Sequence, residues 1–201
     1  MRTHPVSKIQ LFALVLTSLL ASSPLPATAS AAVTPALTQE AGGDGLEADE
    51  QLIQREVGLF HDASISLGQA IAIAQKLYAG SRIADIAFDG GSGHPIYRVR
   101  VLQNGQVLER TIDARTGDLS GTQIVSTVRK LSAEDRNNLA ALAAVRQELS
   151  DAVAVAERAG AGKAISGGLM NKRGRLNFVI VIVSGNQLKQ VELEPPKIRG
   201  R

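Results

Sequence analysis

The chain has 201 residues, no cysteine, 3% aromatic residues and a formal net charge of +3. The lack of cysteine excludes a disulfide framework, a thiolate metal or redox site and a cysteine for lipid attachment. Few aromatic rings are available to stack on bases, which argues against nucleic-acid binding. Stability has to come from the packing of one medium domain or two small ones.

Residues 1–29 have the composition of an export signal. Arg2 and Lys8 precede the apolar run "IQLFALVLTSLLA", and two small-x-small cleavage positions follow, at 27–29 and 29–31. Without these two basic residues the net charge is +1. The apolar run is too short for a membrane span, so we expect a mature protein in the periplasm or outside the cell. An uncleaved N-terminal anchor is the main alternative.

Charge is distributed unevenly along the mature chain. Residues 40–62 carry seven acids against Arg55, whereas residues 149–201 carry nine basic residues against four acids. We expect residues 30–62 to be a flexible acidic leader, with a short helix near residues 51–60. The C-terminal stretches "NKRGR" and "KIRGR" are most simply solvated, and contact with an anionic membrane surface or an acidic partner is the alternative.

Residues 66–80 predict an amphipathic helix. Ser66 and Gln69 have the spacing of a capping box, and Gly80 is a natural stop. Apolar residues recur at helical spacing on one face, namely Leu67, Ala70, Ile71, Ala74, Leu77 and Tyr78.

A strand is predicted at residues 82–89, and a β-hairpin with the turn Asn104-Gly105 is predicted at residues 96–113. A two-residue turn places Arg100 opposite Glu109, which helps to define the register. In the first strand of the hairpin, Tyr97, Val99 and Val101 alternate with Arg98 and Arg100.

The order of helix, strand and hairpin occurs a second time. "ELSDAVAVAERAG" follows the pattern of "ISLGQAIAIAQKL" at a shift of 82 residues, and "FVIVIVSGNQLKQVELE" follows "YRVRVLQNGQVLERTID" at a shift of 81. Two homologous small units are the simplest interpretation. Between them, Ser132 begins an Ala- and Leu-rich linker helix that can run on into the helix of the second unit.

The segments "ISLGQAIAIAQKL", "HPIYRVRVL" and "GQVLERTIDARTGDL" together resemble the PepSY domain, over residues 64–120. A weaker resemblance covers residues 147–196, where "EPPKI" stands in place of the closing turn. Arg110 also departs from the apolar residue expected beside Ile112. The residues that match the family pattern are Tyr97, Val99, Val101, Asp113, Ala114, Thr116 and Gly117.

The resemblance implies an α+β fold of two small units, each a helix packed on an antiparallel β-sheet, joined by a linker helix. It implies an exported or envelope protein without enzyme activity, and a protein-binding or peptidase-inhibiting role, since the family includes segments of peptidase propeptides. The expected division is a signal peptide at 1–29, a flexible acidic leader at 30–62, a PepSY-like domain at 63–121, a mostly helical linker at 122–146, a divergent PepSY-like domain at 147–196 and a basic tail at 197–201.

Few residues can carry chemistry, and we predict no catalytic, cofactor or metal site. After the signal the histidines are His61 and His94, which lie in segments of different character without the convergent ligands that a metal needs. The loop "GGSGHP" lacks the Gly-Lys-Ser/Thr ending of a phosphate-binding loop. Asp85 and Asp89 flank a predicted strand and are expected to be solvated acids.

The stretch "DARTGDL" predicts a structural turn. Asp113 can accept backbone N–H bonds from the residues that follow it, Thr116 belongs to the same turn, and Gly117 can adopt the left-handed conformation.

The strand "FVIVIV" is apolar on both faces through Val179, Val181 and Val183, so we expect it to be covered. The linker helix, the other unit or a docking protein can supply the cover, and a cover from within the chain is favoured. Together with Arg98 and Arg100, these valines are our candidate partner surface.

We therefore predict a non-catalytic exported protein-binding module that modulates a peptidase or another envelope protein. One alternative is a membrane-surface-associated envelope protein that uses its basic C-terminal region. A less favoured alternative is a metal-dependent enzyme whose site is assembled from residues distant in sequence.

Overall fold

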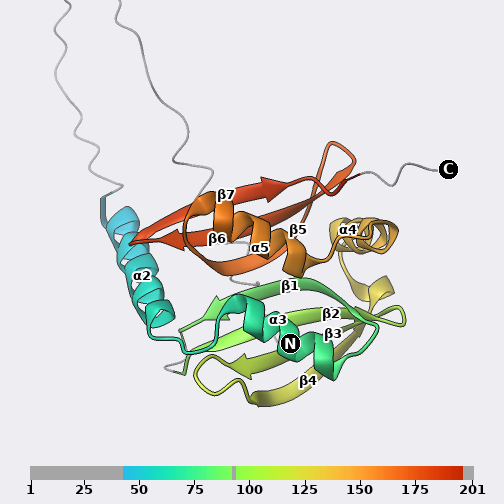
Figure 1. The fold of residues 1–201 in the computed structure, drawn as a ribbon, viewed down its shortest axis with the longest axis horizontal. Helices are drawn as coiled ribbons and strands as arrows, with labels where there is room; N and C mark the ends of the chain where they lie inside the picture. The colour runs from blue at the N-terminus through green and yellow to red at the C-terminus, as the bar shows by residue number, and fades with distance from the viewer. Residues whose placement is uncertain (1–42, 92–93, 197–201) are drawn as a thin grey trace, which may run out of the picture. The chain divides into compact units, whose positions relative to one another are not determined.

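Seven antiparallel strands form one continuous sheet in the order β4-β3-β2-β1-β5-β6-β7 (Figure 1). The structure is a computed structural model that describes residues 43–91 and 94–196, so the predicted signal peptide and basic tail lie outside the described residues. In chain order the elements are α2 (Gly43–His61), α3 (Leu67–Leu77), β1 (Arg82–Asp89), β2 (Ile96–Gln103), β3 (Gln106–Asp113), β4 (Leu119–Thr127), the 3-10 helix η1 (Val128–Lys130), α4 (Ala133–Ala144), α5 (Leu149–Gly160), β5 (Lys163–Lys172), β6 (Arg175–Ser184) and β7 (Gln187–Leu193).

Helix α3 begins at the predicted capping box. The Gln69 N–H donates to Ser66 Oγ at 3.2 Å, and the Ser66 N–H donates to the Gln69 side chain at 2.8 Å. Leu67 and the other core-facing residues of the helix are buried. The helix ends at Leu77, and Gly80, with a φ of 77°, turns the chain toward β1. The predicted helix is therefore confirmed.

Tyr97 of β2 connects the sheet to the loop that precedes α3. Its side chain is fully buried, and its hydroxyl donates to the Ile65 carbonyl at 2.6 Å. Its ring meets Phe88 edge-on with centroids 5.6 Å apart, and Phe88 meets Phe60 of α2 in the same way at 5.3 Å. Burial raises the pKa of the Tyr97 hydroxyl. A buried tyrosine needs a hydrogen-bond partner, so this position has a structural role.

The β2–β3 hairpin has the predicted turn and register. Asn104 and Gly105 have φ values of 50° and 72°, as a type I′ turn requires. Arg100 lies opposite Glu109, and Tyr97 lies opposite Ile112. Both the turn and the cross-strand pair expected from the sequence are confirmed.

The chain has two helix-and-strand segments, one from α3 to β4 and one from α5 to β7, and they meet where β1 pairs with β5. Ile86 of β1 pairs with Gly167 of β5, and the 81 positions between them equal the shift between the two similar hairpin sequences. A Cβ on Gly167 would lie 3.0 Å from Ile180 Cδ1 and 3.4 Å from Leu149 Cδ1. Packing of α5 and β6 against β5 therefore leaves little room for a larger residue at this junction.

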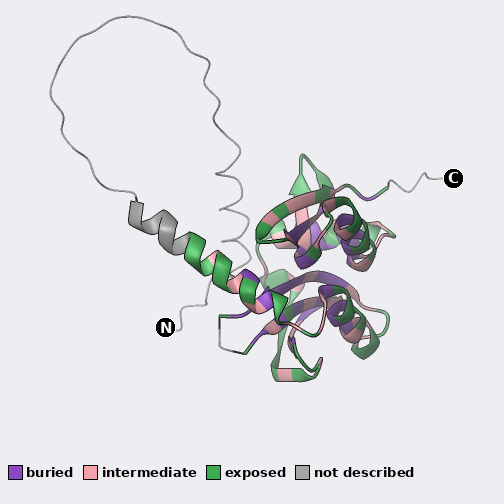
Figure 2. Ribbon diagram, turned by 60° about the vertical axis from the view of Figure 1, so that its left-hand side comes forward, coloured by how far each residue is buried: buried purple, intermediate pink, exposed green. Residues whose placement is uncertain are grey.

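The predicted α+β class is confirmed. Helices α3 and α5 lie over the same face of the sheet, with α3 on β1, β2 and β5, and α5 on β5 and β6 (Figure 1). The buried apolar side chains between Val57 and Val183 form a single cluster that includes residues of both helix-and-strand segments. Figure 2 shows buried residues, in purple, in both segments. The sequence suggested a separate sheet for each unit, whereas the structure joins them because the edges of β1 and β5 pair.

Three elements differ from the sequence-based expectation. Helix α2 (Gly43–His61) is longer than the short helix expected near residues 51–60, and it occupies much of the stretch expected to be a flexible leader. Strand β4 runs across the expected end of the first domain into the expected helical linker, and its β-branched residues Ile124, Val125 and Thr127 favour a strand. Helix α4 ends at Ala144 and α5 begins at Leu149, so the linker helix does not continue into the helix of the second segment.

The stretch "DARTGDL" forms a hydrogen-bonded turn after β3. Asp113 Oδ1 accepts from the backbone N–H groups of Arg115 at 2.8 Å and Thr116 at 2.9 Å. These bonds, led by that of Thr116, lower the pKa of Asp113. Thr116 Oγ1 accepts from the Asp118 N–H at 3.1 Å, and Gly117 has a φ of 79°. The side chains of Asp113 and Thr116 thus bond to backbone groups of the turn itself, which is a structural role.

Replacing Gly117 by valine should lower the free energy of unfolding by at least about 1 kcal/mol, because the left-handed backbone strains a β-branched residue. A Cβ there would also lie 3.1 Å from Ile73 Cδ1. Gly174 is the matched control, because its φ is 77° but a Cβ on it would meet no atom of the described residues within 4 Å. Urea unfolding should show a larger loss for Gly117→Val than for Gly174→Val, and equal losses would contradict the packing argument.

Candidate functional site

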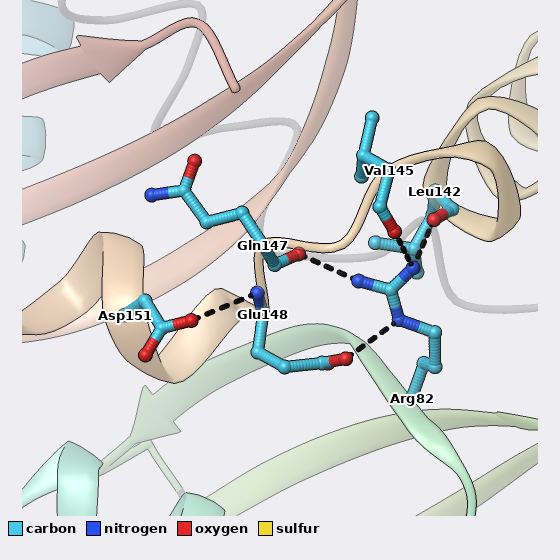
Figure 3. A network of polar contacts seen from close by, with 6 residues as sticks. All are labelled: Arg82, Leu142, Val145, Gln147, Glu148 and Asp151. Carbon is cyan, nitrogen blue, oxygen red and sulfur yellow. Dashed lines mark hydrogen bonds and ion pairs between the residues drawn. The ribbon is translucent and has the colours of Figure 1, made fainter. Parts of the chain in front are cut away.

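Arg82, at the start of β1, binds the segment that connects α4 to α5 (Figure 3). Its guanidinium donates to the carbonyl oxygens of Leu142, of Val145 at 2.6 Å and of Gln147 at 2.6 Å. Its Nε lies 3.0 Å from Glu148 Oε1 in an ion pair, and the Arg82 side chain is 18% exposed. One partly buried cation thus serves four acceptors.

These contacts explain why the two helices are separate. The last carbonyls of a helix lack partners within the helix, and Arg82 satisfies those of Leu142 and Val145 at the end of α4. Glu148 is the N-cap residue of α5, and its backbone N–H donates to Asp151 Oδ2 at 3.1 Å. A planar guanidinium can bond to several acceptors at once, which a lysine ammonium cannot do in the same geometry.

A small polar cavity of about 50 Å³ lies between α4 and the sheet. Asp85 and Arg100 alternate along their strands with the core residues Ile86 and Val99, so they point from the face opposite α3. Within the described part of the chain, Asp85 Oδ1 and a side-chain oxygen of Asn138 are buried without a hydrogen-bond partner. A cavity of this size and polarity fits ordered water. Its lining is Ala84, Asp85, Arg100, Val107, Asp135, Asn138, Leu139 and Leu169.

Asp85 has an unusual ionisation. Burial raises its pKa to about 7, the positive charge of Arg100 opposes this, and the negative charges of Glu109 and Asp135 add to it. The Asp85 carboxyl also lies close to the backbone of β5, since a Cβ on Gly168 would be 2.9 Å from Asp85 Oδ2. Near neutral pH this carboxyl therefore exists in both protonation states.

Asp89, at the other end of β1, is 6% exposed. Its Oδ2 accepts from Arg98 Nε at 2.8 Å and lies 2.8 Å from Arg98 Nη2. The expectation that Asp85 and Asp89 are solvated acids is wrong. Both side chains lie on the face of β1 that is opposite to the face of Ile86. Helix α4 covers this face near Asp85, and the Arg98 side chain covers it near Asp89.

The residues of the candidate partner surface differ in accessibility. Val181 and Val183 are 7% and 3% exposed, so the chain itself covers them, whereas Val179 is half-buried. The Arg98 side chain is 48% exposed, and Arg100 is half-buried. The arginines lie on β2 and the valines on β6, with β1 and β5 between them. Their role in partner binding stays a prediction.

A larger hollow of about 330 Å³ lies at the turn between β5 and β6 and is the place of the basic stretch "NKRGR". Lys172 Nζ lies 2.7 Å from Glu192 Oε2 and lowers the pKa of that carboxyl, while Arg175 lies 3.3 Å from Glu194. Arg173 has no ion pair within the described ranges, so the hollow has an excess of positive charge. Its lining is Lys172, Arg173, Arg175, Asn177 and Glu194.

Within residues 43–91 and 94–196, no group of three or more His, Asp or Glu side chains is placed to hold a metal ion. His61 Nε2 lies 3.2 Å from the Gly185 carbonyl, and His94 is an exposed residue of the loop before β2. No helix of the described part has the length and apolar character needed to cross a membrane.

Residues 64–122 match the PepSY family, described as "Peptidase propeptide and YPEB domain". This segment is a PepSY domain. It comprises α3, β1, β2, β3 and the first residues of β4. Its family-typical residues have structural roles, since Tyr97 holds the loop before α3, and Asp113 and Gly117 form the closing turn. Arg110, which departs from the family pattern, lies opposite Val99 and donates to the Gly121 carbonyl at 3.4 Å.

No curated protein matches the chain. Among solved structures, a candidate lipoprotein of Clostridium difficile 630 is 18% identical, with a TM-score of 0.39, over 67% of this chain and 89% of that chain. A similarity of this size carries no argument about function.

Two of the residues that organise this region have no recognisable local signal in the sequence. Arg82 and Asn138 are polar residues in ordinary surroundings, and their partners are 31 to 66 positions away. Asp85 does have a signal, because it is a single acid between apolar neighbours in "RIADIAFD". An acid in such a strand is either on a solvated face or under a second layer, and the sequence does not distinguish these.

Replacing Arg82 by leucine should lower the free energy of unfolding by about 2 to 4 kcal/mol, because three carbonyls and the Glu148 carboxylate lose a charged partner. Arg82→Lys should recover part of the loss. Arg136→Leu is the control, since the side chain of this exposed arginine donates to one described carbonyl, that of Leu131. Chemical denaturation in which Arg82→Leu and Arg136→Leu cost the same would contradict the bridging role.

Asp85→Asn should change how stability depends on pH. The pKa of Asp85 is higher in the folded protein, about 7, than the value near 3.8 expected in the unfolded chain. Its contribution to the free energy of unfolding is therefore fully present below pH 3.8 and is lost as the pH rises to about 7. The wild type should therefore lose stability relative to Asp85→Asn across this window, by on the order of 4 kcal/mol at most. Urea unfolding at several pH values measures the difference.

Asp113→Asn is a control for which the stability difference from the wild type should change with pH in the opposite direction. The pKa of Asp113 is lowered, so its contribution is present above the unfolded pKa and is lost as pH falls through the folded pKa. The wild type should be more stable than Asp113→Asn at neutral pH, and the difference should disappear in acid. If the stability of the wild type relative to Asp85→Asn rose with pH, as expected for Asp113→Asn, the assigned burial of Asp85 would be wrong.

Proposed function

We propose that this chain is a non-catalytic exported protein-binding module that modulates a peptidase or another envelope protein. The observation that carries the proposal is the PepSY domain at residues 64–122, whose family description names peptidase propeptides. Its family-typical residues, such as Tyr97 and Asp113, are engaged in holding the fold. Any function of this domain is therefore expressed through its surface.

We also propose that residues 147–196 are a divergent second PepSY-like unit. Helix α5 is followed by β5, β6 and β7, the order in which α3 is followed by β1, β2 and β3. Register shifts occur in β1 between Ile83 and Asp85 and in β5 between Ala164 and Ser166, again 81 positions apart. An irregularity retained at the same position supports descent from a common unit.

The basic hollow at the β5–β6 turn supports an acidic segment of a protein as the partner. Arginine and lysine side chains around a concave surface bind carboxylates by charge-assisted hydrogen bonds. The charges of Lys172 and Arg175 are partly neutralised by Glu192 and Glu194, which leaves Arg173 as the most available donor. Of the candidate partner surface, Arg98, Arg100 and Val179 keep accessible area and remain proposed contacts.

The second candidate function is association with an anionic membrane surface. The same cations favour it, because basic residues near a surface are attracted to anionic lipids. The hollow shape and the interspersed glutamates favour a protein partner over a flat lipid surface.

The test is capture of partners from the native envelope with residues 30–201, followed by reconstitution of binding with the purified partner and assay of its peptidase activity. The proposal expects one reproducible partner that is lost when Lys172, Arg173 and Arg175 are changed to glutamate. The control changes Lys76, Arg115 and Arg129, three exposed basic residues elsewhere, to glutamate and should retain binding.

Co-sedimentation with vesicles distinguishes the two candidates. Binding to anionic vesicles that is absent with neutral vesicles, and that is lost in the hollow variant but not in the control variant, would favour the membrane function. Failure to recover any partner at several salt concentrations would contradict the protein-binding proposal.

A further inference from the structure

The two edge strands of the sheet differ in chemistry. Strand β7 carries Lys189 and Glu192, and charged side chains on an edge strand commonly oppose pairing with another strand. Strand β4 has the sequence LSGTQIVST, without a charged residue or a proline. Among the described residues, β4 pairs with β3 alone, so its outer edge is unpaired (Figure 1). The charged side chains that protect β7 are therefore missing from β4.

Strand β4 also exposes large apolar side chains. Ile124 is 56% exposed, Val125 is 51% exposed and Leu119 is 40% exposed. Val125 pairs with the core residue Leu108, whereas Ile124 pairs with Glu109 on the opposite face. Apolar surface thus flanks the open backbone edge on both sides, which is typical of strands that acquire a partner.

The second half of β4 is the regular part of the strand. Ile124–Thr127 pair without interruption with Gln106–Glu109 of β3. The first half contains an irregularity around Gly121, which has a φ of 67°. A bulge of this kind disturbs an edge, so the stretch available for regular pairing is Ile124–Thr127.

We propose that a second copy of this chain pairs with β4, antiparallel and about a two-fold axis at Val125, so that residues 124–126 of the two copies pair directly. Two identical uncharged strands meet without like-charge repulsion. The axis places Val125 opposite the partner's Val125, and Ile124 opposite the partner's Ser126. The chain already contains this arrangement at its centre, where Ile86 faces the residue 81 positions later.

The small area of the proposed β4–β4 contact predicts a weak association. A pairing over a few residues buries less than the surface of a standard stable interface, so the dimer should be weak and dependent on concentration. The β5–β6 turn lies in the half of the sheet away from β4. Dimerisation therefore leaves the basic hollow accessible, and its test is independent of the proposed function.

Sedimentation equilibrium of residues 30–201 over a wide concentration range is the first test. The wild type should show a monomer–dimer equilibrium, and Val125→Lys should shift it to monomer. Leu77→Lys is the control, because Leu77 is 47% exposed but lies on α3. Circular dichroism checks that each variant is folded. A wild type that stays monomeric throughout, or a dimer unaffected by Val125→Lys, would overturn the proposal.

Disulfide trapping is the second test and does not depend on a disruptive variant. The chain has no cysteine, so in Val125→Cys any disulfide joins two copies. Directly opposed residues in antiparallel strands have Cβ atoms about 4.5–5.5 Å apart, close to the separation that a disulfide spans. Val125→Cys should form linked dimers several-fold faster than Leu77→Cys under mild oxidation. Equal rates would indicate random collision and would reject the two-fold arrangement.

Discussion

The pairing of β1 with β5 is the constraint on which the rest of the described structure depends. It rests on two residue pairs, Ile86 with Gly167 and Ala87 with Ser166. Such a short junction is insufficient by itself to hold two halves of a sheet together, because each cross-strand pair contributes at most about 1 kcal/mol. The continuous apolar core and the contacts of Arg82 supply the remaining stabilisation.

The two faces of the joined sheet are covered in different ways. The face under α3 and α5 is filled by the core, and part of the opposite face is covered by α4 above Asp85. Accessible surface includes the β5–β6 turn with its basic hollow and the exposed apolar side chains along β4. The β5–β6 turn lies outside the PepSY match at residues 64–122, whereas β4 begins inside it.

Local features could be predicted where the interacting residues are close in sequence. The Ser66–Gln69 capping box, the Asn104-Gly105 turn and the pairing of Arg100 with Glu109 each depend on residues fewer than ten positions apart. The acids of β1 could not be placed in this way. Whether Asp85 is solvated depends on α4, whose Asn138 is more than fifty residues away.

By itself, the sequence determined the α+β class, the PepSY pattern and the order of most helices and strands, because periodicity, caps and turn residues act over a few positions. It missed β4 as a strand and left open whether the linker helix continues into the next helix. Only the tertiary structure decided that the strands share one sheet, that Arg82 binds the segment between α4 and α5, and which faces are covered. Those outcomes depend on contacts between Ile86 and Gly167 and between other residues far apart in the chain, which no local pattern specifies.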